Sequence, residues 1–343
     1  MDTLIIGSTR KNAGKTGVII GLAQVKGGRF GYVKPLGDRL FYRKKRLWDY
    51  DSSLMVNIFN LDRDPEDLSI GFDHAKIRYM YDEQTIRDRL SDLIENSSGG
   101  ESIVYVEGAQ DLTCGASVNL DAVSVARYTG GKLVIVVSGD DDMIMDDLSF
   151  VKRHVDLSPV DFRGVIVNKV KDPDDFRNTY SDSIEQMGID VIGIMPYKRE
   201  LSYMSVSTLV ERIFVKVLAG EGGLGNVIQN IFIGAESGKS ADMDPRFKRE
   251  NKLVITSGDR SDMIVAALES DTACILLSNN IVPSPAIISK ASELNVPLLL
   301  VPDDTYQVTR QIDSMDIVVA KNETDKINML KLLVAENLDM EKL

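Results

Sequence analysis

The segment from Gly7 to Thr16, Gly-Ser-Thr-Arg-Lys-Asn-Ala-Gly-Lys-Thr, carries the residue types that bind phosphate groups. Glycine lets backbone N–H groups approach phosphate oxygens. A helix that begins here would add unpaired N–H groups and the positive end of its dipole. Lys15 would neutralise the charge of the β- and γ-phosphates, and Thr16 would place its hydroxyl on Mg²⁺. The segment therefore predicts a site for a nucleoside triphosphate, with ATP and Mg²⁺ as the expected ligands.

This phosphate loop departs from the usual pattern at one position. The first glycine of the pattern would fall at Thr9, and Gly7 stands two residues earlier. A purely structural turn is the alternative, but the strand before the loop and the helical run Gly17–Ala23 after it favour binding. The residues expected to contact the nucleotide here are Thr9, Arg10, Asn12, Ala13, Gly14, Lys15, Thr16 and Gly17.

Two acidic segments could complete the Mg²⁺ site, because metal–phosphate sites usually add one or two carboxylates. Glu107 directly follows an apolar run, so it would lie at the carboxyl end of a buried strand, where α/β sheets bind ligands. Asp49 and Asp51 lie in the segment Trp48–Ser52, where an aspartate could equally cap a helix. The sequence leaves these two roles open.

Basic side chains could share the charge of a bound triphosphate. The candidates are Lys15, Lys34 and Arg10. Electrostatic stabilisation of this kind dominates phosphoryl-transfer catalysis, so Lys15 and Lys34 are the candidate catalytic residues. Ser8 and Thr9 are interpreted as phosphate contacts rather than nucleophiles. A carboxylate that is activated here would therefore come from the ligand.

Short apolar runs rich in Val and Ile recur along the first part of the chain and are nearly continuous rather than alternating. Strands buried on both faces have this pattern, and the segments between them carry helical spacing, as in Glu83–Ile94. The alternation predicts an α/β fold with a mostly parallel sheet, as in a P-loop NTPase domain. The expected strands are Thr3–Ile6, Phe30–Val33, Ile103–Val106, Leu133–Val137, Gly164–Val167 and Asp190–Ile194.

The glycine-rich segment 219–225 indicates a domain boundary near residue 220, after which the α/β rhythm restarts. We therefore expect a nucleotide-binding domain over 1–218, a smaller α/β domain over 222–333 and a C-terminal tail over 334–343. The segment Asn322–Leu343 has the spacing of an amphipathic helix. The strands expected in the second domain are Asn230–Ile233, Lys252–Thr256, Ala273–Leu277, Pro297–Val301 and Asp316–Ala320.

Charge and composition argue against some classes of function for this protein. The net charge is −12 and the pI about 4.8, which argues against a nucleic-acid role. The basic cluster Arg43–Arg46 is interpreted as a solvated loop. The two cysteines, Cys114 and Cys274, are far apart and fit a reduced, cytoplasmic protein. No apolar run reaches the roughly 18 residues of a membrane span, so we expect no membrane association.

Several motifs occur in an order that resembles dethiobiotin synthetase-like P-loop proteins. They are Gly7-Ser8-Thr9, Gly14-Lys15-Thr16, Tyr32-Val33-Lys34-Pro35-Leu36, Val106-Glu107-Gly108-Ala109, Gly164-Val165-Ile166-Val167-Asn168-Lys169 and Ile194-Met195-Pro196. Residues 222–312 resemble the DRTGG domain through Ile255–Asp262, Asp271–Cys274 and Val301–Thr305. The tandem pair resembles the N-terminal half of long-form phosphate acetyltransferase. Together the resemblances cover roughly nine-tenths of the chain.

The resemblance to the synthetases implies roles for individual residues. Lys34, the lysine of the Lys-Pro pair, would assist carbamate phosphorylation, and Asp51 and Glu107 would bind Mg²⁺ together with Thr16. Asn168 would contact adenine. Two segments depart from the family, Gly37-Asp38-Arg39 and Gln110-Asp111, and both correspond to regions that shape the diaminopelargonate pocket. We therefore expect the nucleotide half of the site to be kept and biotin-pathway activity to be absent.

The long transacetylase carries a further catalytic domain after its DRTGG domain, and this chain ends at Leu343. We therefore expect no phosphate acetyltransferase activity from the chain by itself. DRTGG domains are accessory, regulatory and self-associating, which implies a homodimer through residues 222–333 and a metabolic enzyme as a further partner. Gly258, Asp259 and Arg260 form the candidate site of this domain, where they would bind an anion, bind a nucleotide or pair across the dimer. A helix start capped by Asp259 is the alternative.

Three functions compete at this point. The preferred hypothesis is a nucleotide-responsive sensor or accessory protein of metabolism that binds ATP and signals through the DRTGG domain. The second is an ATP-dependent, ligase-like enzyme that phosphorylates a carboxylate, for which Lys15, Thr16, Lys34 and Glu107 speak together. The third, an ATPase that serves metallocentre assembly, lacks a cysteine pair suited to metal handoff.

Overall fold

The computed structural model of the chain describes residues 2–43, 45–213, 215–234, 243–313, 315, 319 and 323–343. Contacts divide the chain into two units, Met1–Lys198 with Val318–Leu343, and Arg199–Ile317. The chain therefore leaves the N-terminal unit once and returns to it at its C-terminal end. The domain bounds expected from the sequence, 1–218, 222–333 and 334–343, remain predictions, because a sequence domain need not coincide with a contact unit.

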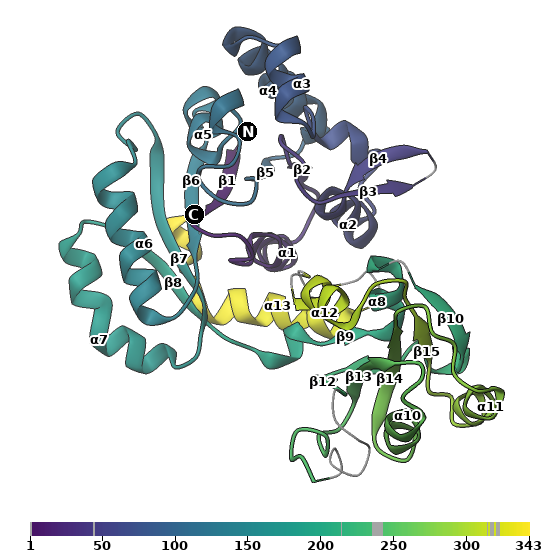
Figure 1. The fold of residues 1–343 in the computed structure, drawn as a ribbon. Coiled ribbons are helices and arrows are strands. Elements are labelled where there is room, and N and C mark those ends of the chain that lie inside the picture. The colour runs from purple at the N-terminus through teal and green to yellow at the C-terminus, as the bar shows by residue number, and fades with distance from the viewer. Residues whose placement is uncertain are drawn as a thin grey trace. The chain divides into compact units, whose positions relative to one another are not determined.

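The apolar runs of the N-terminal unit pair into one six-stranded sheet with the order β2-β5-β1-β6-β7-β8, and every neighbouring pair is parallel. The chain leaves the central strand β1 first toward β2 and β5 and later toward β6 (Figure 1). The carboxyl end of β1 is therefore a topological switch point, where α/β sheets bind ligands. The strands are β1 (Asp2–Ser8), β2 (Gly31–Val33), β5 (Ile103–Glu107), β6 (Lys132–Val137), β7 (Asp161–Val170) and β8 (Val191–Pro196). All six expected strands are confirmed.

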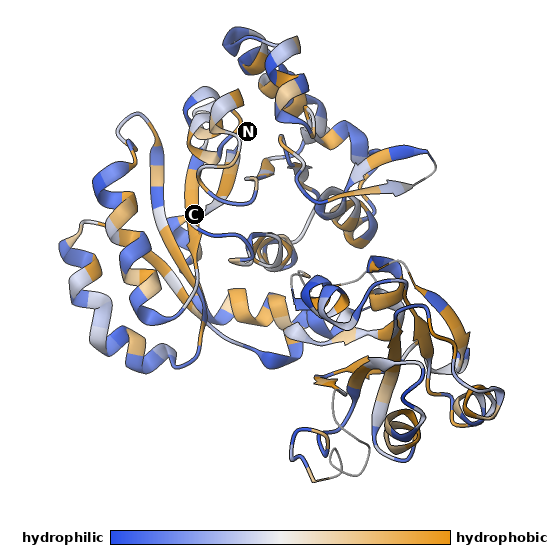
Figure 2. Ribbon diagram, in the orientation of Figure 1, coloured by the Kyte–Doolittle hydropathy of each residue, from blue (hydrophilic) through white to orange (hydrophobic). Residues whose placement is uncertain are grey.

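Helices cover both faces of this sheet because the strands are apolar on both sides, as their orange ribbons show (Figure 2). Side chains such as Ile5 and Ile135 pack under α4 to α7, whereas α1 contacts β1 and β5, and α13 contacts β8. The helices of this unit are α1 (Lys15–Lys26), α2 (Tyr50–Phe59), α3 (His74–Met80), α4 (Glu83–Ser98), α5 (Ala122–Thr129), α6 (Asp141–His154), α7 (Pro173–Gln186) and α13 (Thr324–Asn337).

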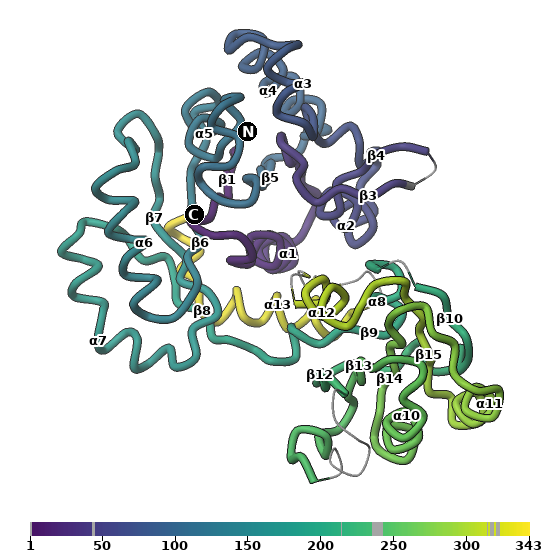
Figure 3. Tube along the Cα trace, in the orientation of Figure 1, coloured from purple at the N-terminus to yellow at the C-terminus, as the bar shows by residue number. Residues whose placement is uncertain are grey.

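The C-terminal helix α13 packs against α1, the helix that follows the phosphate loop (Figure 3). Two glycines one helical turn apart on α1 allow the approach. A Cβ on Gly17 would lie 3.3 Å from Leu330 Cδ2, and a Cβ on Gly21 would lie 2.4 Å from Val334 Cγ2 and 2.7 Å from the Leu330 carbonyl oxygen. The expected amphipathic helix at the C-terminal end is thereby confirmed, and its apolar face has a defined partner.

Replacing Gly21 with alanine is expected to lower the free energy of unfolding of the N-terminal unit by about 1–3 kcal/mol, because the new methyl group meets backbone that cannot move alone. This loss outweighs the roughly 1 kcal/mol that alanine adds to a helix. Trp48 is the only tryptophan, so its fluorescence in urea reports on this unit. Gly17→Ala, which meets only a flexible side-chain end, is the matched control. Equal urea midpoints for Gly21→Ala and wild type would contradict the packing argument.

A two-stranded antiparallel hairpin, β3 (Leu40–Arg43) with β4 (Arg46–Asp49), is a feature that the sequence did not predict. The basic cluster Arg43–Arg46, interpreted from sequence as a solvated loop, instead includes the ends of both strands. Four residues are too short a run to show clear alternation, so the strand pattern is weak here. The hairpin matters because the residues before and after it enter the candidate site.

The second unit contains a five-stranded sheet with the order β10-β15-β14-β13-β12, in which only β10 runs antiparallel to its neighbour. Successive side chains of β13 point to opposite faces. Val254 packs in a core with α10 and α11, and Leu253 packs in a core with α8 and α12. The elements are α8 (Val206–Arg212), β10 (Lys216–Ala219), β12 (Asn230–Ile233), β13 (Lys252–Ser257), α10 (Ser261–Leu268), β14 (Thr272–Ser278), α11 (Pro285–Glu293), β15 (Leu298–Leu300) and α12 (Thr305–Asp313).

Short elements complete both units. They are the β9–β11 pair (Met204–Ser205 and Val227–Ile228) and the 3-10 turns η1 (Pro65–Leu68), η2 (Ala116–Val118), η3 (Arg199–Ser202), η4 (Glu221–Gly223) and η5 (Met340–Lys342). Four of the five strands expected in the second domain are confirmed as β12, β13, β14 and β15. The fifth, Asp316–Ala320, falls outside the described residues except for Val319. In the described part of the chain, no helix combines the length and the apolarity that crossing a membrane requires.

Candidate functional site

The phosphate loop connects the carboxyl end of β1 to the N-terminus of α1, so Lys15 and Thr16 are the first two residues of the helix. Gly14 precedes the helix with a φ of 102°, a left-handed conformation that glycine adopts without strain. A Cβ at this position would also lie 2.3 Å from Asn168 Nδ2. The glycine is therefore required both by the turn and by the close approach of β7. The first N–H groups of a helix lack intrahelical partners, and this helix start is the one that the sequence assigned to phosphate.

Lys15 is buried, and its ammonium donates to Ser8 Oγ at 2.8 Å and to the Gln110 carbonyl oxygen at 3.1 Å. Burial lowers the pKa of Lys15, and the nearby Glu107 carboxylate partly opposes this shift. Both hydrogen-bond acceptors are neutral, so they satisfy two of the three ammonium donors without cancelling the charge. The site therefore holds a desolvated positive charge that an anionic ligand would stabilise.

Thr16 and Glu107 lie in direct contact, because Thr16 Oγ1 donates to Glu107 Oε1 at 2.7 Å. The other carboxylate oxygen accepts a hydrogen bond from the Tyr32 hydroxyl at 2.9 Å. Burial, and then repulsion from the Asp51 carboxylate, raises the pKa of Glu107 to about 7. Of the three metal ligands expected from the sequence, Thr16 and Glu107 are thus in contact, and the charge of the third, Asp51, acts on Glu107. Hydroxyl and carboxylate oxygens are the ligand types that Mg²⁺ takes in phosphate sites, so this set fits the ion.

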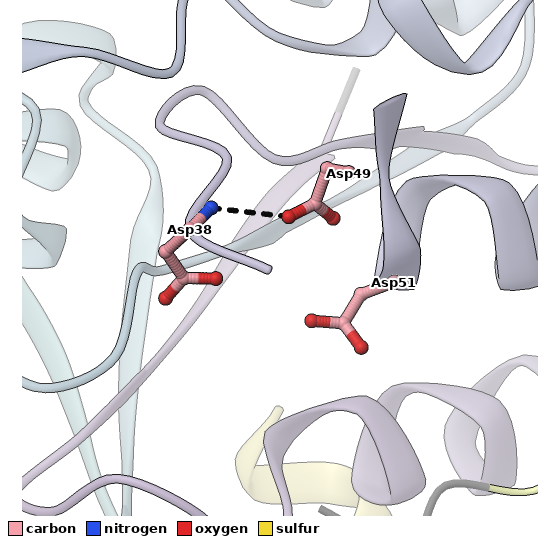
Figure 4. Close-up of side chains that lie close together, drawn as sticks. All are labelled: Asp38, Asp49 and Asp51. Atoms are coloured by element: carbon pink, nitrogen blue, oxygen red, sulfur yellow. Dashed lines mark hydrogen bonds between the residues drawn. The ribbon is translucent and has the colours of Figure 1, made fainter. Parts of the chain in front are cut away.

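A cluster of buried charges surrounds Lys34 beside the phosphate loop. Its Nζ atom lies 2.5 Å from Asp38 Oδ1, 2.6 Å from Asp51 Oδ2 and 3.3 Å from Asp49 Oδ2. Figure 4 shows the three aspartates, whose oxygens lie within 4.8 Å of one another and form a possible metal-binding group among the described residues. Arg39 Nη1 donates to the remaining Asp51 oxygen at 2.8 Å. In this arrangement an ammonium occupies the centre of the carboxylate group.

The pKa values follow from this pairing. Burial alone would lower the pKa of Lys34, but the Asp51 and Asp49 carboxylates outweigh burial and hold the pKa well above its ordinary value. For Asp51, burial favours the neutral acid, yet Lys34 and Arg39 reverse the effect and lower the pKa to about 2. The cluster is therefore ionised at neutral pH at Lys34 and Asp51.

The roles of the two aspartates that the sequence left open are now distinct. Asp49 is the N-cap of α2, with its Oδ1 accepting from the Ser52 N–H at 3.0 Å and its Oδ2 from the N–H groups of Asp38 and Arg39 at 3.1 Å each. Asp51, the second residue of α2, turns toward Lys34. The capping interpretation thus holds for Asp49, and Asp51 is the acid that faces the site.

Sequence reasoning missed Tyr32, Asp38 and Arg39 as site residues. Asp38 and Arg39 lie in the segment that departs from the synthetase pattern, and that departure was the available signal. Tyr32 lies on β2, where an aromatic side chain in an apolar run looks like core; only its hydroxyl contact with Glu107 marks it. The sequence of one strand does not show which polar group on another element its side chain will contact.

Arg10 projects from the phosphate loop toward α6, where it forms a two-point ion pair with Asp147. Its Nε donates to Oδ2 at 2.8 Å and its Nη2 to Oδ1 at 2.9 Å. The guanidinium is partly exposed, so the pair contributes at most about 1 kcal/mol to stability. A triphosphate would have to compete with Asp147 for this side chain if Arg10 shares its charge.

In the second unit, the candidate residues Gly258, Asp259 and Arg260 lie in the loop between β13 and α10. The N-cap of α10 is Arg260 and not Asp259, so the alternative in which Asp259 caps the helix does not hold. Asp259 is exposed, and Arg260 Nε lies 3.5 Å from Asp262 Oδ1. A Cβ on Gly258 would lie 1.7 Å from the Ile281 carbonyl oxygen, which explains the glycine by the close approach of two loops. A ligand role for this loop stays a prediction.

The fold and the phosphate-loop site define a P-loop NTPase-like protein, and comparison with known families agrees. The chain belongs to the AAA domain family, whose model matches residues 2–205. A second family model, the DRTGG domain, matches residues 208–315. The recognition of a P-loop domain followed by a DRTGG domain is thereby confirmed.

Among curated proteins, the phosphate acetyltransferase of Nitratidesulfovibrio vulgaris is 21% identical over 367 aligned residues, which cover 100% of this chain and 51% of that protein. The chain thus spans about half the length of the curated relatives it matches. Among solved structures, the CBS and DRTGG domains of Clostridium perfringens pyrophosphatase, complexed with diadenosine tetraphosphate, are 19% identical with a TM-score of 0.29, covering 38% of this chain and 60% of that chain. The MinD cell division protein of Aquifex aeolicus is 19% identical with a TM-score of 0.35, covering 59% and 84%.

Proposed function

We propose that the chain is a nucleotide-responsive sensor or accessory protein of metabolism. In this proposal the phosphate loop binds ATP with Mg²⁺, and the DRTGG domain conveys the bound state to a partner enzyme. The observation that carries the nucleotide part is the arrangement of Lys15, Thr16 and Glu107 at one helix start: a buried ammonium for the phosphates beside a hydroxyl–carboxylate pair for the metal.

The charges around Lys34 favour a sensor over a ligase. Activation of a substrate carboxylate would need Lys34 to turn toward the reacting groups, yet it is held by Asp38, Asp49 and Asp51. Breaking such a buried arrangement leaves charges unpaired and costs several kcal/mol. A carboxylate substrate would also meet the negative charge of Asp51. Nucleotide binding without rapid turnover fits these charges better.

The second candidate function is an ATP-dependent, ligase-like enzyme that phosphorylates a carboxylate. Its support is that the Lys34 ammonium is near enough to contribute to the lowered pKa of Lys15, while the Glu107 carboxylate acts on both lysines. A ligand that drew Lys34 away from its aspartates could then use both ammonium groups on a transferring phosphoryl group. The two functions predict different turnover with the same nucleotide affinity.

Calorimetry with MgATP, followed by ATP hydrolysis measured against a panel of small carboxylates, tests both functions. A sensor is expected to bind MgATP tightly and to hydrolyse it negligibly with every carboxylate. Turnover that one carboxylate stimulates would establish the ligase instead. If wild-type protein shows no heat with MgATP at millimolar concentration, the nucleotide site itself is refuted.

We further propose that the chain forms a homodimer through the DRTGG domain. The edge strand β12 supports this, because Ile231 and Ile233 are 43% and 45% exposed on a sheet edge that pairs with no further strand among the described residues. Light scattering is expected to give twice the monomer mass at micromolar concentration, and Ile233→Lys is expected to shift the protein toward monomer. The exposed helix position Leu332→Lys is the control. A monomer mass at every concentration would rule the dimer out.

A further inference from the structure

Two consecutive residues at the end of β7 hold the phosphate loop by its backbone carbonyl groups. Asn168 Nδ2 donates to the Ala13 carbonyl oxygen at 2.8 Å, and Lys169 Nζ donates to the Asn12 carbonyl oxygen at 2.6 Å. The Lys169 N–H donates in turn to Asn168 Oδ1 at 2.9 Å, so the amide of Asn168 is fixed at both ends. This pair reaches the loop from more than 150 residues away in sequence.

Holding these carbonyl groups also aims the N–H groups that bind phosphate. A trans peptide is planar, so its C=O and N–H point in opposite directions. The Asn12 carbonyl points to Lys169, so the Ala13 N–H points away from it. The Ala13 carbonyl points to Asn168, so the Gly14 N–H likewise points away from Asn168. Successive N–H groups oriented in this way form a concave anion-binding nest.

The loop needs such support because its backbone is not in a low-energy extended or right-handed form. Asn12 has a φ of 64° and Gly14 a φ of 102°, both in the left-handed region. A non-glycine residue there costs of order 1 kcal/mol and persists only where its surroundings hold it. Asn168 is buried and can come this close only because Gly14 lacks a Cβ. The loop and the end of β7 are thus complementary.

We propose that Asn168 and Lys169 are positioning residues for phosphate: they preset the N–H groups of the loop for a polyphosphate chain. This inference rests on the proposed function and deepens it. It changes the role expected of Asn168, because contact with a base would affect only nucleotides, whereas positioning of the loop affects every ligand that carries the polyphosphate. Both polar atoms of the Asn168 amide already form hydrogen bonds within the protein: Nδ2 donates to the Ala13 carbonyl oxygen, and Oδ1 accepts from the Lys169 N–H.

Calorimetry with two probes, MgATP and magnesium tripolyphosphate, separates the roles. Asn168→Ala and Lys169→Met are each expected to weaken both probes by the same factor, about ten-fold for one lost hydrogen bond to the loop. Lys171→Met removes an equal charge from an exposed residue two positions along and is expected to change neither affinity. Loss confined to MgATP, or no loss with either probe, overturns the inference.

NMR order parameters of the ligand-free protein distinguish positioning from general destabilisation. In Lys169→Met, the order parameters of the amides of residues 12–14 are expected to fall and those of the sheet strands to stay unchanged. An unchanged loop overturns the inference. Because Lys169 is exposed, this variant serves where Asn168→Ala fails to fold. If wild-type protein binds neither probe, the proposed nucleotide site fails; if wild type binds both and the variants lose only MgATP, only the positioning role fails.

Discussion

Lys34→Met is expected to lower the free energy of unfolding of the N-terminal unit at pH 7 by about 3–5 kcal/mol, because it leaves buried carboxylates without their cation. Asp51, which is 2% exposed, loses its closest positive partner and keeps the ion pair with Arg39. The change is measured by urea unfolding followed through Trp48 fluorescence. Lys76→Met, an exposed lysine on α3 of the same unit, is the control and is expected to change stability by less than about 0.5 kcal/mol.

The pH dependence of this variant has a definite sign. In wild type, the Asp51 pKa of about 2 lies below the unfolded value near 3.9, so its stabilisation is present above pH 4 and is lost as pH falls toward 2. Without Lys34, burial raises the pKa of Asp51 and raises further the pKa of Asp49, which is already above its ordinary value, so the penalty of these carboxylates is relieved as pH falls. The stability difference between variant and wild type is therefore expected to shrink from pH 7 to pH 4. A difference that grows on acidification would show that the carboxylates are not its origin.

The sequence predicted the phosphate-binding part of the site well because the residues that form it are neighbours in sequence. Gly14, Lys15 and Thr16 are contiguous, and a buried strand before them with a helical run after them fixes where their backbone must lie. Glu107 was also predictable, since carboxyl ends of parallel strands meet at one edge of the sheet. The contact between Thr16 and Glu107, 91 positions apart, follows from that rule alone.

The sequence could not predict which charges pair with one another. Lys34 was expected to face the ligand, but the β3–β4 hairpin brings Asp38 and Asp49, eleven positions apart, to the same ammonium. That geometry depends on the hairpin, whose short strands have only a weak sequence pattern. Asn168 shows the same limit: its position at the end of β7 was clear, whereas its partner, a carbonyl of the phosphate loop, belongs to the backbone and has no sequence signature.

The C-terminal helix illustrates a different limit. Amphipathic spacing predicted a helix near residues 322–343, but an apolar face does not name its partner. The partner is α1, and the reason lies in Gly17 and Gly21. The sequence placed both in the helix after the phosphate loop, with Gly17 also as a nucleotide contact, and gave neither a packing role. Small residues one turn apart on one helix and apolar residues on another are compatible with many pairings, so only the folded chain distinguishes them.

Lys15→Met is expected to weaken MgATP binding by about 100-fold or more, because the side chain supplies a desolvated charge for which water is not a substitute. Lys26→Met, at the exposed far end of the same helix, is the matched control and should leave the affinity within about two-fold. Calorimetry at one salt concentration measures both. Equal affinities of Lys15→Met and wild type would refute the phosphate-loop assignment.

The same substitution is expected to leave the ligand-free protein as stable as wild type, or more stable. Lys15 gives up its hydration for two neutral acceptors, Ser8 Oγ and the Gln110 carbonyl, and its lowered pKa reports that burial disfavours the charge. An apolar side chain of similar length avoids this cost. Thermal unfolding without ligand should therefore show no loss, while the stabilisation that MgATP gives to wild type should vanish. If the ligand-free variant melts well below wild type, Lys15 contributes to the stability of the fold. If its melting temperature is unchanged or higher and binding is lost, the Lys15 charge serves an anionic ligand at some expense of stability.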